Sequence, residues 1–128
     1  MSKVLIIDDE KDILDLIESL LEMELGIEVI KASDGAEGIQ NIQQFSDIDL
    51  IICDVNMPER GGREVFLENL ASKNLPFIIM TGSDELEVSF TEKFTNANPY
   101  NRILPKPWKP KEFLSVVKNI VEDKISVG

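Results

Sequence analysis

Acidic side chains follow two short apolar runs of the sequence. Asp8, Asp9 and Glu10 come directly after VLII, and Asp54 closes LIIC and precedes Asn56 by two residues. Crowded carboxylates repel one another, so a site that gathers them either raises its own pKa values or binds a cation. Mg²⁺ suits two or three oxygen ligands because it keeps several waters, whereas Ca²⁺ takes more ligands. If folding brings these acids together, we expect a Mg²⁺ site.

A hydroxyl and an ammonium group follow two further apolar runs. Thr81 comes directly after FIIM, and Lys106 stands between two prolines shortly after RIL. Each has an ordinary alternative explanation: a threonine there is usually a turn residue, and such a lysine is usually a solvated loop cation. The acids could equally cap helices or turns, Asp54 included. A shared site is favoured only if one edge of the fold collects all of these side chains.

Periodicity predicts the elements that would position these residues. Apolar runs indicate five strands, at residues 4–7, 27–32, 50–53, 77–80 and 102–104. Stripes of helical period indicate helices around 13–21 and 113–121, and less regular segments add helices at 36–45, 63–72 and 84–94. Strict alternation predicts a doubly wound α/β domain with a parallel sheet and helices on both faces. Ligands of such sheets bind beyond the carboxyl ends of the strands, where the acids, the threonine and the lysine stand.

Length and composition exclude several classes of function. The 128 residues predict one domain, and no apolar run approaches the roughly 20 residues of a membrane span. The absence of histidine removes Ser/His and Cys/His nucleophilic systems, and the single Cys53 is expected to be a packed core thiol. A net charge of −11 argues against unaided binding to nucleic acid or anionic lipid. The start MSKVLII leads into DDE after a short apolar run, which is too short and too acidic for a signal peptide, so we expect a cytoplasmic location.

Four motifs in order give the chain a family resemblance. The set DDE, D-x-N-M-P-x-x-x-G from Asp54 to Gly62, Thr81-Gly82 and Lys106-Pro107 resembles the receiver domain of two-component response regulators. It covers essentially the whole chain, and the chain is similar to stand-alone, CheY-like members. The resemblance implies a flavodoxin-like sheet of strand order 2-1-3-4-5, a single receiver domain over residues 1–128 without an output domain, and a cis Lys106-Pro107 bond.

The resemblance also implies roles for the site residues. Asp54 would accept a phosphoryl group from a phosphohistidine on a sensor histidine kinase or histidine phosphotransfer protein. Asp9, Asp54 and the backbone carbonyl of Asn56 would hold Mg²⁺, with Asp8 in support. The metal and Lys106 would bracket the phosphoryl oxygens, in a reaction that depends mainly on positioning and electrostatics.

The switch that the resemblance implies departs from the family pattern at one position. Thr81 would donate its hydroxyl to the bound phosphoryl and so alter binding to a downstream protein target. Family members usually carry Tyr or Phe where this chain has Ile103, and Tyr100 or Trp108 could substitute for that ring. The segment TNANPYNR also replaces the usual small-residue turn, so we expect an unusual output surface.

Two alternative functions remain open at this stage. The first is a receiver-like interaction module that does not switch by phosphorylation, which the Ile103 departure keeps open. The second is a Mg²⁺-dependent aspartyl phosphatase similar to haloacid dehalogenase-like enzymes, which carry an acid two residues after the nucleophile. Asn56 occupies that position here, so we expect no enzyme activity beyond self-phosphorylation from a donor and slow autodephosphorylation.

Overall fold

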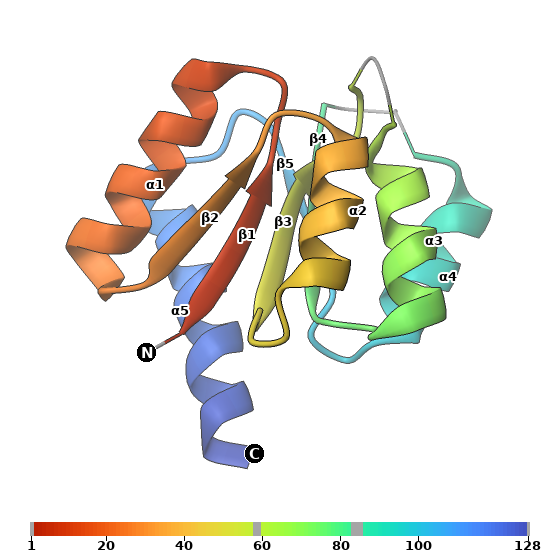
Figure 1. Ribbon diagram of the computed structural model, residues 1–128. Helices are drawn as coiled ribbons and strands as arrows, with labels where there is room; N and C mark the ends of the chain where they lie inside the picture. The colour runs from red at the N-terminus through yellow and green to blue at the C-terminus, as the bar shows by residue number, and fades with distance from the viewer. Residues whose placement is uncertain (1, 58–59, 83–85, 128) are drawn as a thin grey trace.

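The sheet of this protein has the predicted architecture. The computed structural model describes residues 2–57, 60–82 and 86–127, with side chains up to residue 123. Five parallel strands lie in the order β2-β1-β3-β4-β5 (Figure 1). Their bounds are β1 Lys3–Ile7, β2 Glu28–Ala32, β3 Leu50–Asp54, β4 Phe77–Thr81 and β5 Arg102–Pro105. The predicted strand order 2-1-3-4-5 is confirmed. β5 is an edge strand, so Pro105 is tolerated there because one side of the strand has no neighbouring strand that needs a backbone N–H.

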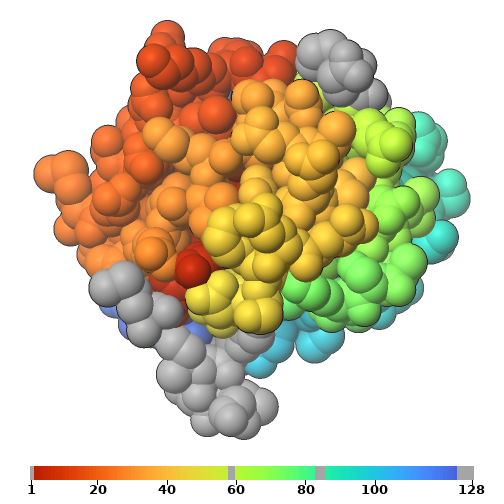
Figure 2. Space-filling view, in the orientation of Figure 1, coloured from red at the N-terminus to blue at the C-terminus, as the bar shows by residue number. Residues whose placement is uncertain are grey.

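Helices cover both faces of this sheet. One face packs against α1 (Lys11–Leu25) and α5 (Pro110–Val127), and the other against α2 (Gly35–Gln44), α3 (Gly62–Ser72) and α4 (Val88–Ala97). On the side seen in Figure 2, α2 and the segment that follows it lie in front of the sheet, with α3 beside them. Among the described residues, no helix combines the length and the apolar character needed to cross a membrane.

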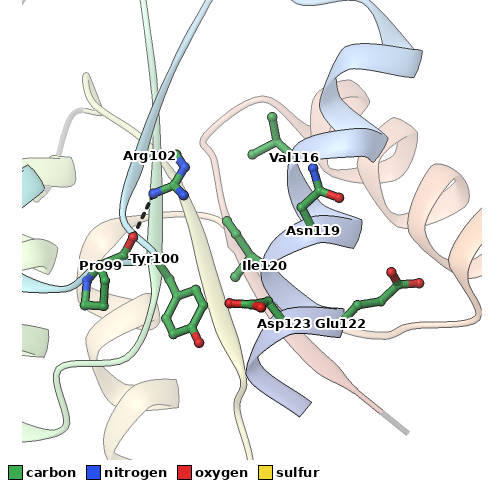
Figure 3. A pocket seen from close by; sticks show the side chains of 8 residues that line it. All are labelled: Pro99, Tyr100, Arg102, Val116, Asn119, Ile120, Glu122 and Asp123. Atoms are coloured by element: carbon green, nitrogen blue, oxygen red, sulfur yellow. Dashed lines mark hydrogen bonds between the residues drawn. The ribbon is translucent and has the colours of Figure 1, made fainter. Parts of the chain in front are cut away.

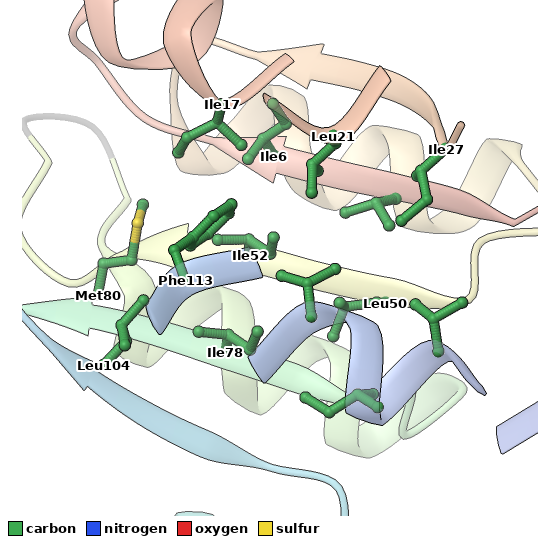
Figure 4. Close-up of a cluster of buried hydrophobic side chains, with 14 of the residues drawn as sticks. Ile6, Ile17, Leu21, Ile27, Leu50, Ile52, Ile78, Met80, Leu104 and Phe113 are labelled. Atoms are coloured by element: carbon green, nitrogen blue, oxygen red, sulfur yellow. The ribbon is translucent and has the colours of Figure 1, made fainter. Parts of the chain in front are cut away.

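The alternation of side chains along the strands explains why both faces are filled. Successive residues of a strand point to opposite faces, so a strand buried on both sides is apolar throughout. Ile52 and Ile78 point toward α1 and α5, where they pack with Phe113 (Figure 4). Ile51 and Ile79 belong to the cluster on the opposite face. The continuous apolar runs that predicted β3 and β4 therefore supply both layers of the core.

Aromatic rings dominate the layer beneath α3 and α4. Phe66 of α3 makes edge-to-face contacts with three rings, and its centroid lies 5.1 Å from that of Phe94, 5.5 Å from that of Phe90 and 6.0 Å from that of Phe77. Phe66, Phe77 and Phe94 are fully buried. Such pairs add to the free energy of burial when their rings meet at an angle. This cluster fixes α4 against the sheet through Phe94.

The fourth helix begins later than the sequence predicted. The stripe of Leu86, Phe90 and Phe94 suggested a helix over 84–94, whereas α4 spans Val88–Ala97. Leu86 and Glu87 are not helical, and residues 83–85 lie outside the described residues. Leu86 packs against the same aromatic layer without being helical. Leu86 is therefore apolar because it packs against this cluster, and its helical spacing from Phe90 does not mean that it belongs to the helix.

Candidate functional site

The carboxyl ends of β3 and β5 bring Asp54 and Lys106 into contact. Asp54 is the last residue of β3, and Lys106 follows Pro105 at the end of β5. The Lys106 Nζ atom donates to Asp54 Oδ1 at 2.6 Å, although 52 positions separate the two in sequence. Asp54 is 5% exposed, whereas the Lys106 side chain is 40% exposed. A buried carboxylate is thus held against an ammonium group that reaches it from the solvent side.

Three acids at the end of β1 form a compact cluster next to this pair. Carboxylate oxygens of Asp8, Asp9 and Glu10 lie within 4.8 Å of one another. Asp8 is buried and accepts a hydrogen bond from the Glu10 backbone N–H at 2.9 Å, whereas Asp9 and Glu10 are exposed. Oxygen-only donors with excess negative charge are the set that a hard divalent cation such as Mg²⁺ prefers. The residues present therefore fit a Mg²⁺ ion.

The electrostatics of Asp8 reflect this crowding. Burial raises the pKa of Asp8 to about 6 and outweighs the Glu10 hydrogen bond, which lowers it. The charges of Asp54 and Asp9 raise the same pKa further, while that of Lys106 lowers it. A carboxyl group that resists ionisation in this way gains a partner when a cation arrives. The raised pKa of Asp8 thus reflects mainly its burial, with a smaller contribution from the neighbouring carboxylates.

The predicted metal ligands lie in three different surroundings. Asp8 and Asp9 belong to the acid cluster, Asp54 lies at the Lys106 ammonium, and Asn56 is exposed in the loop after β3. Glu10 joins the cluster but was not among the predicted ligands. The only sequence signal for it was its place in DDE, because an acid there is as well explained by a helix cap. Which of these oxygens bind a metal stays a prediction.

Two glycines explain how the loop after β3 returns to the strand end. The Gly62 N–H donates to the Val55 carbonyl at 2.9 Å. A Cβ atom at Gly61 would lie 2.7 Å from the Val55 carbonyl oxygen, and one at Gly62 would lie 2.9 Å from that of Asp54. Only glycine lets the two backbone segments approach so closely. Gly62, the glycine of the D-x-N-M-P-x-x-x-G motif, and Gly61 before it therefore help to position Asp54, although residues 58 and 59 lie outside the described residues.

Thr81 connects the end of β4 to the lysine. Its backbone carbonyl accepts a hydrogen bond from the Lys106 N–H at 2.7 Å, and its hydroxyl donates to the Gly82 carbonyl at 2.7 Å. Thr81 is buried, so its hydroxyl needs such a partner. The Lys106-Pro107 peptide bond is cis, as the resemblance implied. The Thr81 carbonyl thus helps to fix the position of the Lys106 backbone, from which the lysine side chain extends to Asp54.

Neither aromatic candidate takes the place of Ile103. Ile103 packs in the layer under α2, α3 and α4, whereas Tyr100 and Trp108 pack on the opposite face of the sheet. Trp108 stacks on Phe113 with ring centroids 4.5 Å apart. The suggestion that either ring substitutes for the usual one is wrong for the conformation described here, because the sheet separates both from Ile103.

The two rings line separate hollows. Trp108 lines one of about 390 Å³ beside the site, together with Ile13, Leu16 and Lys106. Tyr100 lines another of about 670 Å³ at the other end of β5, between that strand and α5 (Figure 3). Burial and a hydrogen bond to Asp123 raise the pKa of Tyr100. Tyr100 is therefore a residue of the far end of the molecule, while Trp108 borders the site.

Comparison with known proteins agrees with this geometry. The profile of the response regulator receiver domain matches residues 4–118. The response regulator SaeR of Staphylococcus aureus is 30% identical over 122 residues, which cover 94% of this chain and 51% of SaeR. The chain thus spans about half the length of the curated relatives that it matches.

Solved structures resemble the whole chain. A CheY-like receiver domain protein from Methanospirillum hungatei has a TM-score of 0.85 and 25% identity, with 100% of this chain and 99% of that one covered. A receiver domain protein from Clostridium thermocellum has a TM-score of 0.79 and 27% identity, with both chains fully covered. Since the family profile spans nearly all of the strands and helices that build the site, this chain belongs to the family of response regulator receiver domains.

Proposed function

We propose that Asp54 is a phosphoacceptor, which takes a phosphoryl group from a phosphohistidine on a partner protein in a Mg²⁺-dependent reaction. Receiver domains signal through phosphorylation and bind Mg²⁺ at an acidic pocket. The observation that carries the proposal for this chain is the 2.6 Å contact of Lys106 Nζ with Asp54 Oδ1 beside the Asp8, Asp9 and Glu10 cluster. A carboxylate oxygen, an ammonium group and a set of cation ligands are the parts that phosphoryl transfer needs.

The chemistry can be assigned to atoms of this chain. A carboxylate oxygen of Asp54 attacks phosphorus and the P–N bond to the donor imidazole breaks, which gives an acyl phosphate. The donor ring, already protonated on its other nitrogen, keeps the electron pair of the broken bond and leaves as neutral imidazole. Asp9, Asp54 and the Asn56 carbonyl, with Asp8 in support, would hold Mg²⁺, which would supply charge neutralisation. Lys106 would neutralise further phosphoryl charge, since its ammonium already lies at the acceptor carboxylate.

Thr81 is the residue that would report the new group. Its hydroxyl now donates to the Gly82 carbonyl. A phosphoryl on Asp54 adds about −1.5 to −2 charges and strong acceptor oxygens, so the hydroxyl gains a better acceptor if it turns toward Asp54. That turn changes the loop between β4 and α4 and thereby the surface offered to a downstream protein.

The partners follow from the same chemistry. The donor is a sensor histidine kinase or a histidine phosphotransfer protein, because the chain itself contains no histidine. The hollow lined by Ile13, Leu16 and Trp108 opens beside Lys106, where apolar side chains of a donor would be accommodated. The proposal includes a cytoplasmic location and a protein target, and it excludes direct binding to nucleic acid or membranes on grounds of the −11 charge.

Ile103 supports a second candidate, an interaction module that does not switch. Ile103 has no ring to swing, and Tyr100 and Trp108 lie on the other face of the sheet. Trp108 fluorescence separates the two functions, since the indole borders the hollow beside Lys106. A response to Mg²⁺ with beryllofluoride that is lost in Asp54→Asn supports phosphorylation-dependent switching. No response in either protein favours the module.

The direct test is phosphoryl transfer followed by intact mass. The chain is incubated with phosphorylated candidate kinases and Mg²⁺, and in parallel with acetyl phosphate. We expect one added phosphoryl group on the wild type and on Asp47→Asn, an exposed control acid, and none on Asp54→Asn. An equal mass gain in Asp54→Asn would move the acceptor to another residue. Generic phosphate esters should not be turned over, because Asn56 provides no acid.

A further inference from the structure

The turn between α3 and β4 caps two different helices with consecutive residues. Lys73 Nζ donates to the Phe45 carbonyl at 2.8 Å and also to the Ile42 carbonyl, at the end of α2. Asn74 Nδ2 donates to the Ala97 carbonyl at 2.9 Å, at the end of α4. Asn74 has a φ of 48°, a left-handed conformation that asparagine adopts more readily than most residues. This turn lies at the amino end of β4, and the candidate site lies at the other end of the strands.

Two further asparagines complete the attachment of α4. Asn98 Nδ2 donates to the Asn74 carbonyl at 2.9 Å, so the two turns hold each other. Asn101 Nδ2 donates to the Phe94 carbonyl at 2.9 Å, while its Oδ1 accepts the Phe77 N–H at 2.9 Å. Both Asn98 and Asn101 are buried. The last turn of α4 is therefore tied by side chains to β4 and to the turn before it.

These amides replace an ordinary helix cap. The last carbonyls of a helix lack partners within it and are commonly satisfied by the backbone around a left-handed glycine. Helix α4 instead ends at Asn98 in an extended conformation, with a φ of −154°. The Phe94 and Ala97 carbonyls receive side-chain amides of Asn101 and Asn74 in its place. The TNANPYNR segment thus has a structural purpose at the C-terminal end of α4.

Among the described residues, the N-terminal end of α4 is held by the packing of Phe90 against Phe66 and by one ion pair, without a capping side chain. Its capping residue Glu87 makes no side-chain capping hydrogen bond, and its first turn contains no acid. Glu87 pairs with Arg63 at 3.3 Å, but the Glu87 side chain is 67% exposed, and exposed pairs contribute little. Val88 is 74% exposed. This end of α4 lies near the carboxyl ends of the strands, where Asp54 and Thr81 stand, because α4 follows β4 in the chain.

We infer that Asn74, Asn98 and Asn101 form a clamp that fixes the C-terminal turn of α4, so that α4 opens and pivots from its N-terminal end. The two Asn101 hydrogen bonds are buried and costly to break without replacement, and those donated by Asn74 and Asn98 are partly buried. The exposed ion pair at the other end of α4 is cheap to break. Movement is thereby directed to the half of α4 nearest Thr81. The clamp acts in the protein whether or not Asp54 is phosphorylated.

Native-state hydrogen exchange, measured by NMR on the full chain without ligand, tests the clamp. In the wild type, amides of the last turn, Thr95 to Ala97, should exchange at least about tenfold more slowly than those of Thr91 and Glu92. Asn74→Gly keeps the left-handed turn and deletes only the amide that caps α4. It should accelerate exchange of the last turn about fivefold to tenfold and leave Thr91 and Glu92 unchanged.

Lys73→Met is the matched control, because it removes the same kind of cap from α2 at the neighbouring position. It should accelerate exchange at the end of α2 only, around Gln44 and Phe45. The clamp is refuted if the wild-type last turn exchanges as fast as the first. It is equally refuted if Asn74→Gly leaves α4 unchanged or accelerates exchange evenly over the whole protein, since the amide would then have no local role.

Discussion

Ionisation of Asp8 should lower the free energy of unfolding of this protein in a pH-dependent way. Burial first, and the charges of Asp54 and Asp9 next, raise the pKa of Asp8 from 3.8 to about 6 in the folded state. Between these values the folded state binds more protons than the unfolded state, so stability falls as pH rises through this range and is level above it. Two pKa units at about 1.4 kcal/mol each give a total loss of about 3 kcal/mol.

Asp8→Asn removes this loss while keeping the local structure. Asparagine has the same shape, and its carbonyl oxygen can still accept the Glu10 N–H that now bonds Asp8 Oδ1 at 2.9 Å. Urea unfolding without divalent ions should therefore show the variant to be more stable than the wild type by up to about 3 kcal/mol at pH 7.5, with about half of that gain at pH 5. Mg²⁺ should stabilise the wild type more than the variant, because the variant lacks one ligand charge.

Asp9→Asn is the control for this prediction. Asp9 belongs to the same cluster but is exposed, so its neutralisation should change the free energy of unfolding much less. The reasoning about Asp8 is refuted if Asp8→Asn has the same effect at pH 5 and pH 7.5. It is also refuted if the variant is the less stable protein at pH 7.5, since the buried charge would then be stabilising.

Two substitutions test the rest of the site and the core. Lys106→Met should tighten Mg²⁺ binding about fivefold in titration calorimetry, because the ion no longer displaces an ammonium from Asp54, and should slow phosphorylation by acetyl phosphate; weaker Mg²⁺ binding would contradict this. Gly38→Ala should lower the free energy of unfolding by about 1–3 kcal/mol, since its Cβ would lie 2.4 Å from Cδ1 of the fully buried Ile7. An unchanged urea midpoint would instead mean that Ile7 adopts another rotamer and that the helix propensity of alanine compensates.

Secondary structure was predicted correctly where the residues of a single segment, such as a continuous apolar run, were sufficient to indicate a strand. The runs LIIC and FIIM indicated strands, and both are buried throughout because each faces helices on both sides. The start of α4 was wrong because Leu86 matched the period of Phe90 and Phe94 without being helical. Local periodicity cannot separate a helical residue from a loop residue that packs on the same layer.

The sequence alone determined the order of the elements, the sheet topology through its family resemblance, and the set of residue types at the strand ends. Only the tertiary structure decided that Asp8 is buried while the adjacent Asp9 is exposed, that Lys106 contacts Asp54 across 52 positions, and that Trp108 and Ile103 lie on opposite faces of the sheet. Burial and contact depend on which elements pack together, and packing is a property of the whole fold. Residue type and spacing state what chemistry is available, and the folded chain determines which groups meet.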